Sequence, residues 1–133
     1  MAGHFLRAPR AYVRRVRLHN VTFDAQDPAA LATFWSAVLE RPVADGANRF
    51  VAMIDRTPTD PRWLFLRVPE DKTAKNRMHV DLDCDDLGAA RSQLEALGAS
   101  FVHEKDEYGI HWLTFRDPEG NEFCVASHEA DPT

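Results

Sequence analysis

The sequence has few cysteines and no long apolar run. Its two cysteines, Cys84 and Cys124, form no CxxC pair and do not indicate a disulfide framework. No apolar stretch approaches the roughly 20 residues needed to span a bilayer. We therefore expect a protein of the reducing cytoplasm with no membrane partner.

Acidic residues are absent from the first 23 positions. This segment carries only basic charge, in the form of Arg7, Arg10, Arg14, Arg15 and Arg17. Residues 1–15 are expected to be a basic N-terminal extension, either disordered chain running into the first strand or a transit peptide. Because the whole chain has a net charge of -5, the remainder is more acidic still. That balance argues against a nucleic-acid partner.

What is present is the composition of an ordinary globular protein. Hydrophobic residues make up 44% and charged residues 28% of the 133 positions. This length suffices for one domain with a buried core. We place the domain at 16–127, with residues 128–133 as a C-terminal tail.

A strand, a turn and a helix open the domain. Residues 13–23 alternate and are rich in β-branched side chains, which predicts a strand. Asp27 can cap a helix whose first turn contains Pro28. The helix is predicted near 28–40 because its apolar residues recur at helical spacing. Two further strands, "RFVAMID" and "RWLFLRV", follow.

The same order then returns. "MHVDLDCDD" predicts a strand ending at Asp86, and "LGAARSQLEALG" a helix over 87–97 that stops at Gly98. "SFVHE", "IHWLTFRDP" and "EFCVASH" predict further strands. Superposing Asp27 on Asp86 places Asn20 on His79. The repetition indicates a duplicated βαβββ module, with units at about 16–70 and 76–127.

A tight turn precedes the last predicted strand. Its sequence is "DPEGN", in which proline presets one backbone dihedral and glycine or asparagine tolerates positive φ. Turn chemistry alone accounts for these residue types, but the other segments that occur with this turn are more specific to one family. "DPAALATFWSAVL", "WLFLRVPE", "HVDLDCDDLGAARSQLEALGA" and "FRDPEGNEFCV" stand together in one chain.

These segments resemble the vicinal oxygen chelate superfamily, which includes glyoxalase I, bleomycin-resistance proteins and extradiol dioxygenases. The likeness covers about residues 16–127 and is greatest to the glyoxalase-like domain of small actinobacterial-type proteins. It implies an α+β fold in which two βαβββ modules form an eight-stranded half-open barrel around a cleft. It also implies a homodimer. One departure is Glu40, where the family usually has glycine after the first helix.

The resemblance further implies one divalent metal, held by His or Gln in the first strand, Glu in the fourth, His in the fifth and Glu in the eighth. In this chain those positions are Asn20, Phe65, His79 and Cys124. Both carboxylates that a hard cation prefers are missing. Zinc could use His79 and Cys124, but a catalytic zinc normally needs three good protein ligands. We therefore expect no metal, no cofactor, and neither glyoxalase I nor extradiol dioxygenase activity.

Strand alternation supplies the candidate site. His79 and Asp81 share one face of their strand, as do Asn20 and Thr22 on the equivalent strand. His79 and Asp81 are the candidate catalytic pair, because a nearby Arg67 would keep Asp81 ionised beside a titratable histidine. A buried Asp–Arg pair that only satisfies polar groups is the alternative. The predicted ligand-binding residues are Asn20, Thr22, Phe65, Arg67, Trp112 and Cys124.

Three functions follow from this set. The first is binding of a small organic molecule without chemistry, in the manner of bleomycin-resistance proteins; the acidic chain favours a cationic or neutral aromatic ligand. The second is a metal-independent lyase or isomerase that uses His79 and Asp81. A weaker third is a metal-dependent enzyme with an altered ligand set.

Overall fold

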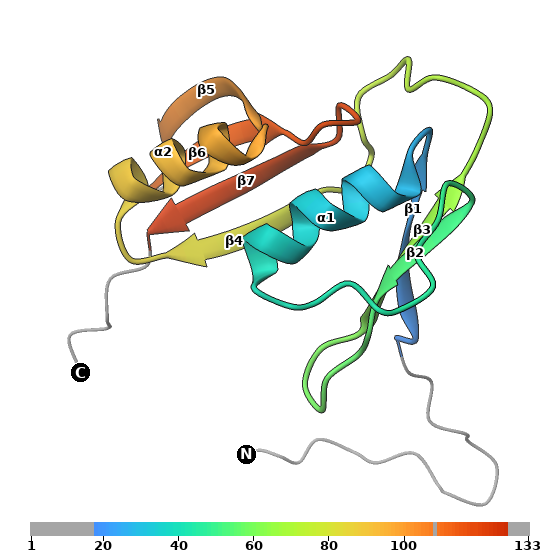
Figure 1. Cartoon of the computed structure of the whole chain (residues 1–133). Coiled ribbons are helices and arrows are strands. Elements are labelled where there is room, and N and C mark those ends of the chain that lie inside the picture. The colour runs from blue at the N-terminus through green and yellow to red at the C-terminus, as the bar shows by residue number, and fades with distance from the viewer. Residues whose placement is uncertain (1–17, 108, 128–133) are drawn as a thin grey trace, which may run out of the picture.

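The order strand, helix, strands occurs twice along the chain (Figure 1). The first module comprises β1 (Asn20–Ala25), α1 (Pro28–Leu39), β2 (Val51–Ile54) and β3 (Arg62–Arg67). The second comprises β4 (Val80–Cys84), α2 (Leu87–Leu97), β5 (Ser100–Glu107), β6 (Ile110–Arg116) and β7 (Glu122–Ser127). This computed structural model describes residues 18–107 and 109–127, so the predicted extension and tail lie outside the described residues. The predicted α+β fold with a duplicated module is confirmed.

Each module forms its own sheet with the same wiring. The first sheet has the order β1-β3-β2 and the second the order β4-β7-β6-β5. In both, the first strand runs parallel to the last strand of its module, and the other pairs are antiparallel. The positions of Asn20 and His79 are therefore equivalent: each lies at the start of the strand that leads into its module's helix.

Seven strands form among the described residues, against the eight of the predicted barrel. At the place in the first sheet that corresponds to β5, Val43 makes a single antiparallel bridge to Ile54. The local sequence explains why no strand continues from it. Pro42 precedes the bridge, Gly46 has a φ of 95°, and the side chain of Asn48 accepts from the Phe50 and Val51 amides. The barrel is thus more open on this side.

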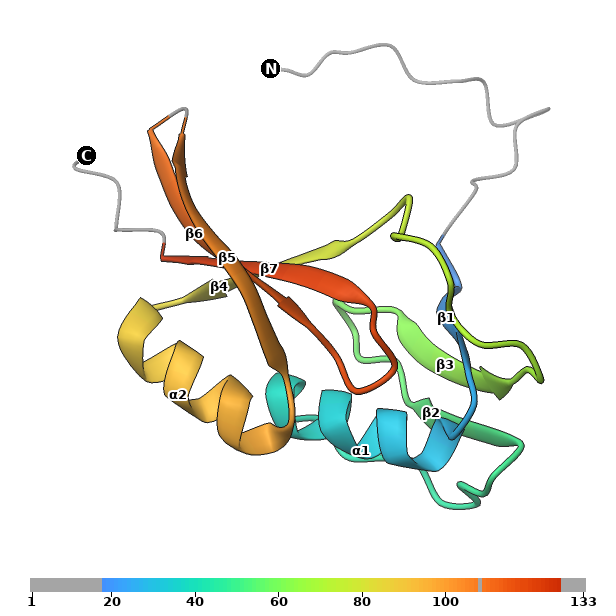
Figure 2. The ribbon, with the colours of Figure 1, turned by 90° about the horizontal axis from the view of Figure 1, so that it is seen from above.

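Both helices begin at the predicted aspartates. The Asp27 carboxylate accepts a hydrogen bond from the Ala30 amide at 3.2 Å, and Asp86 accepts one from Ala89 at 3.1 Å. Pro28 stands in the first turn of α1, where its missing N–H costs no hydrogen bond. The two helices lie on the same side of the molecule, toward the bottom of the view in Figure 2.

An aromatic cluster joins the two modules beneath α1. The Trp35 ring lies 5.2 Å from the Trp63 ring of the first sheet and 4.9 Å from the Phe123 ring of the second. Phe23 stacks on both Trp63 and Phe65. One helix therefore packs on interior strands of both sheets, β3 and β7, and burial of these large side chains is the main stabilising contribution at the junction.

The "DPEGN" turn adds a polar connection between the modules. Buried Asp117 accepts a hydrogen bond from the Trp35 indole N–H at 3.0 Å. The Glu119 carboxylate accepts from the backbone amides of Gln26 and Asp27, at 3.1 and 2.9 Å. The turn from the second module is thereby fixed to the start of α1, so the two modules share one core.

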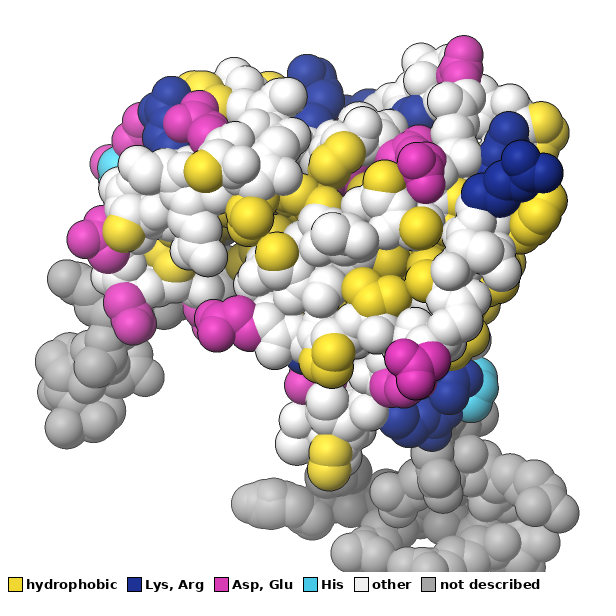
Figure 3. Space-filling model, in the orientation of Figure 1, with side chains coloured by type: hydrophobic (Ala, Val, Ile, Leu, Met, Phe, Trp, Pro, Cys, Tyr) yellow, Lys and Arg dark blue, Asp and Glu magenta, His cyan; other side chains and the backbone are white. Residues whose placement is uncertain are grey.

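The surface on the α1 side is mixed in character. Hydrophobic side chains gather toward the middle of this face, with acidic and basic ones around its margins (Figure 3). No helix among the described residues is long and apolar enough to cross a membrane.

Candidate functional site

A cleft of about 410 Å³ lies between β1 and β4, which are edge strands of the two sheets. Its floor is apolar: the partly exposed Val21, Phe23 and Val80 line it, with the buried Trp35 behind Phe23. The connector between β3 and β4 makes one wall and the "DPEGN" turn another. The cleft lies where the two sheets meet, so residues distant in sequence face one another across it.

Carboxylates outnumber basic groups around this cleft. Five carboxylates and one lysine line it, namely Asp24, Glu70, Asp71, Glu119, Glu122 and Lys72. Glu119 is engaged by backbone amides, and Asp71 accepts from the Gln26 side chain. A hydrogen bond from Lys75 at 2.7 Å holds the pKa of Glu122 below its ordinary value, and Arg116 adds to that effect. The charge of Glu122 is therefore balanced by Lys75, which ties the connector between β3 and β4 to β7. Asp24 and Glu70 are exposed at the rim.

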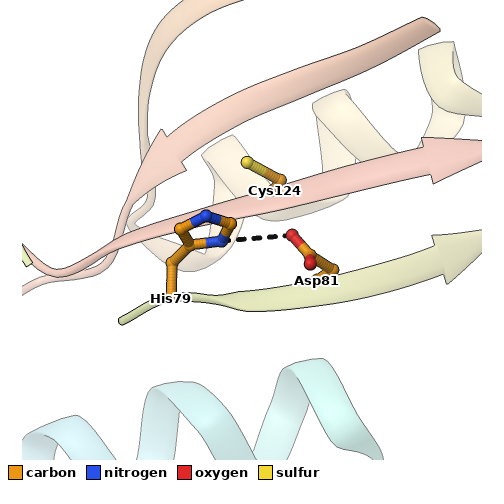
Figure 4. A group of neighbouring side chains, drawn as sticks. All are labelled: His79, Asp81 and Cys124. Atoms are coloured by element: carbon orange, nitrogen blue, oxygen red, sulfur yellow. Dashed lines mark ion pairs between the residues drawn. The ribbon is translucent and has the colours of Figure 1, made fainter. Parts of the chain in front are cut away.

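Three side chains of the second module converge beside this cleft. His79, Asp81 and Cys124 project from the same side of β4 and β7, facing away from α1 (Figure 4). The His79 Nδ1 lies 3.2 Å from the Asp81 Oδ1, and one ligand atom from each of the three residues lies within 4.8 Å of the others. His79 also lines the cleft, so the group borders the ligand-sized space.

The sheet itself sets this grouping. β4 and β7 are parallel neighbours in which Asp81 is paired with Cys124, and β6 continues the row with Thr114 opposite Cys124. His79 precedes Asp81 by two residues, so both point to one face. Thr114 is 3% exposed, and its hydroxyl oxygen lies 3.4 Å from the Cys124 sulfur. Strand backbone thus presents Asp81, Cys124 and Thr114, and His79 immediately precedes β4.

The second cysteine has a different setting. Cys84 packs against the hydrophobic core on the face of β4 opposite Asp81. Burial raises the pKa of its thiol above the ordinary value, although a backbone hydrogen bond from Asp86 opposes the shift. Cys84 is therefore a poorly ionising thiol away from the site, and a useful internal comparison for Cys124.

The structure brings together several of the predicted residues. His79, Asp81 and Cys124 form one group, and Thr22 lines the cleft. Asn20 does not line the cleft, and its side-chain oxygen is buried without a hydrogen-bond partner. Trp112 is half-buried on β6, two residues before Thr114 and on the same face.

Two predicted ligand-binding residues lie elsewhere. Phe65 is 0% exposed and stacks on Phe23 in the core, so its predicted place on the cleft face was wrong. Thr22 is opposite Leu64, as Asp81 is opposite Cys124, which makes Leu64 the fourth-strand equivalent of Cys124. The prediction was out of register by one residue, which reverses the face of every side chain in a strand.

Arg67 was expected beside Asp81. Its guanidinium instead donates to the Val68 carbonyl at 2.5 Å, and Arg67 does not line the cleft. Arg67 belongs to the same face of β3 as Phe65, so the one error in register displaced both residues.

Sequence reasoning missed the contribution of the connector between β3 and β4. Val68, Glu70, Asp71, Lys72 and Asn76 all line the cleft. This stretch reads as a charged, solvated loop, but Lys75 and Asn76 bond to Glu122 and hold its end beside the cleft.

The four positions at which the resemblance implies a metal do not supply a suitable donor set. Leu64 or Phe65 offers no ligand atom in β3, and Asn20 offers only a carboxamide oxygen at β1. His79 and Cys124 remain, both in the second module. Two ligands and an amide that does not line the cleft do not form the oxygen-rich site that a hard divalent cation requires.

Comparisons with known proteins agree with this architecture. A family model described as a glyoxalase-like domain matches residues 20–126. Among curated proteins, no sequence matches the chain.

Solved structures match over most of their length. A glyoxalase/bleomycin resistance protein/dioxygenase family enzyme from Burkholderia phytofirmans PsJN superposes with a TM-score of 0.65 at 16% identity, covering 81% of this chain and 95% of that one. The fosfomycin resistance protein FosX from Mesorhizobium loti gives 0.65 at 13% identity, covering 88% and 95%. Lactoylglutathione lyase from Agrobacterium tumefaciens gives 0.59 at 16% identity, covering 85% and 94%.

Identities this low show a shared fold and nothing about substrate. The family model, which spans most of the chain, supplies the assignment that the structural likenesses alone do not. With the duplicated module, the paired sheets and the "DPEGN" turn, it shows that this chain belongs to the glyoxalase-like domain family.

Proposed function

We propose that the protein binds a small organic molecule with an apolar body and a cationic group in the cleft between β1 and β4. The observation that carries the proposal is the cleft itself, which combines an apolar floor above the buried Trp35 with an acidic rim. Its volume of about 410 Å³ falls in the range typical of small-molecule sites. Binding without chemistry, as in sequestration, is the simplest activity of such a cleft.

The charge of the ligand follows from the rim. Asp24 and Glu70 are exposed carboxylates at the mouth, and Lys72 is the basic side chain among the lining residues. A cationic group near two carboxylates gains Coulomb energy, whereas an anion would be repelled. An aromatic ring can meanwhile pack on the apolar floor, where Phe23 is partly exposed.

Binding can be measured with a matched pair of probes. N-methylquinolinium and 2-naphthoate share size and shape but differ in the sign of charge. We expect the cation to quench tryptophan fluorescence and to show saturable binding in calorimetry, at least about fivefold tighter than the anion, because two such rim contacts contribute roughly 1 kcal/mol. Protein treated with chelator is used so that no metal contributes.

The variant Asp24→Asn should reduce affinity for the cation by roughly two- to threefold, since one of the two exposed ionic contacts is lost. Asp45→Asn removes an exposed carboxylate that does not line the cleft and is the matched control. Equal affinity for cation and anion, or equal effects of the two substitutions, would contradict the proposal.

Proton transfer without a metal is a second candidate function. It is favoured by the 3.2 Å contact between His79 and Asp81, since a carboxylate can orient an imidazole as a general base. Chelator-treated protein would then catalyse deuterium exchange at the α-carbon of small hydroxyketones, detected by NMR. Absence of exchange, or exchange unchanged in Asp81→Asn, would exclude this role for the pair.

We also propose that two copies of the chain pair in the cytoplasm. The two separate sheets leave β1, β2, β4 and β5 as edges, and Phe50, Met78 and Ile110 are large hydrophobic residues exposed near strand ends. Unpaired edges and exposed apolar side chains favour association between copies. Light scattering at micromolar concentration should give twice the 15.1 kDa chain mass, and a monomer mass would refute the pairing.

A further inference from the structure

The group formed by His79, Asp81 and Cys124 offers three different donor atoms to one point. An imidazole nitrogen, a carboxylate oxygen and a sulfur lie within 4.8 Å of one another. In a tetrahedral zinc site the ligand atoms are about 3.3 to 3.8 Å apart, as follows from zinc–ligand bonds of about 2.0 to 2.3 Å. The His79–Asp81 contact at 3.2 Å is already close to that spacing. Small side-chain rotations would bring the sulfur to the same point.

We propose that these three residues bind a single thiophilic divalent cation of the zinc class. The site shares His79 and Cys124 with the four positions implied by the family resemblance, but it takes Asp81 as its third ligand and uses no residue of the first module. Asp81 is the ligand that makes a zinc site chemically reasonable, since His79 and Cys124 alone are too few. The inference goes beyond the proposed function and does not depend on it.

The donor set selects the kind of metal. A thiolate and an imidazole are good ligands for zinc and cobalt, whereas magnesium and calcium prefer an all-oxygen shell. Asp81 and Cys124 lie on two hydrogen-bonded neighbouring strands and His79 immediately precedes one of them, so little backbone entropy is lost when the ion binds. Thr114 stands behind the sulfur at 3.4 Å, where its hydroxyl can donate to a thiolate and hold it in place.

The position also leaves room for a further ligand. The side chains of His79 and Asp81 are 44% and 73% exposed, and His79 lines the cleft. Three protein ligands with one accessible coordination position is the arrangement of catalytic rather than structural zinc. An ion here would therefore present its free position toward solvent beside the cleft.

The local charge favours a cation over a free thiolate. Asp81 directly beside Cys124 would repel a thiolate, and the same carboxylate attracts a divalent ion. A cysteine nucleophile without metal is thus the weaker interpretation of this geometry. Metal binding converts the repulsion between the two anionic groups into shared coordination.

Cobalt(II) provides the test, because a thiolate–cobalt bond gives an intense near-ultraviolet charge-transfer band. Tag-free full-length protein, treated with chelator and then desalted, is titrated with cobalt and afterwards with zinc. We expect the band to saturate at about one ion per chain and to disappear when zinc displaces cobalt. Circular dichroism of each variant confirms that it is folded.

Variants separate this site from others on the surface. Cys124→Ser should abolish the band, and His79→Gln and Asp81→Asn should each weaken cobalt binding at least tenfold. Thr114→Val should weaken it roughly tenfold through the sulfur. Cys84→Ser, which alters the thiol on the opposite face, should leave band and affinity unchanged.

Three results would overturn the proposal. The first is the absence of cobalt binding. The second is binding without a charge-transfer band, which an exposed pair such as His111–Glu104 would give. The third is a band that depends on Cys84 rather than on Cys124. The probe experiment with N-methylquinolinium is done on chelator-treated protein. Failure of one proposal therefore leaves the other intact.

Discussion

Glu40 is the residue that ends α1, and its backbone is in an unfavourable conformation. Its φ of 54° and ψ of 44° lie in the left-handed region, where a β-carbon is crowded and glycine is preferred. The side chain is exposed and places a negative charge at the helix C-terminus, where a cation would be favoured. The departure from glycine noted in the sequence therefore has a conformational cost in the structure.

Replacing this residue should stabilise the protein. We expect Glu40→Gly to raise the free energy of unfolding by about 0.5 to 1 kcal/mol, because relief of left-handed strain exceeds the entropy that glycine adds to the unfolded chain. Chemical denaturation measures the change. Glu40→Gln removes the charge but keeps the β-carbon, so a gain equal to that of Glu40→Gly would assign the effect to charge instead.

At the residue scale, the sequence predicted features that depend on local chemistry. Asp27 and Asp86 cap their helices as predicted, since a cap needs only a short acceptor at the right spacing. The approach of Asp81 to Cys124 was not predictable in the same way. It depends on the register of two strands far apart in sequence, and no local pattern sets that register.

At the scale of the element, β3 shows how a correct strand can carry a wrong face. The strand was predicted at the right place, yet its sequence "RWLFLR" is apolar at four consecutive positions. With no polar–apolar alternation, either face could be buried. Tertiary packing decided it, because Trp63 and Phe65 meet Phe23 under α1.

The register of β3 predicts a large difference between neighbouring residues. Phe65→Ala should cost about 3 to 5 kcal/mol of unfolding free energy, because a fully buried ring leaves a cavity among aromatic neighbours. Leu64→Ala, on the half-buried opposite face, should cost about 1 kcal/mol. Urea denaturation compares the two variants. A larger cost at Leu64 than at Phe65 would restore the register predicted from the sequence.

At the scale of the whole molecule, the fold could be predicted because the module repeats. The packing of the two modules against each other could not, because it depends on contacts between residues far apart in sequence, such as those of Trp35 with Phe123 and Asp117. Turn chemistry explained Asp117 fully, so nothing in the sequence indicated its second role as acceptor for Trp35. The cleft has the same origin, since it exists only where β1, β4 and this turn come together.

The connection between the modules should make them unfold together. Asp117 is 3% exposed and accepts from the Trp35 indole, from the Glu119 and Asn121 amides, and from the Asn121 side chain. Asp117→Asn replaces one acceptor oxygen by a donor NH₂ group. We expect a loss of about 2 to 3 kcal/mol, because a charge-assisted buried network is left with unpaired donors.

Native-state hydrogen exchange shows whether that loss is shared. If the modules form one cooperative unit, Asp117→Asn should lower the protection of the slowest amides in β3 and in β6 by the same free energy. Asp85→Asn, an exposed substitution in the second module, should change both by less than about 0.5 kcal/mol. Protection lost in β6 while β3 is unchanged would mean that the first module is stable by itself. In that case the Trp35–Asp117 bond would only position the cleft, and the aromatic cluster would carry the junction.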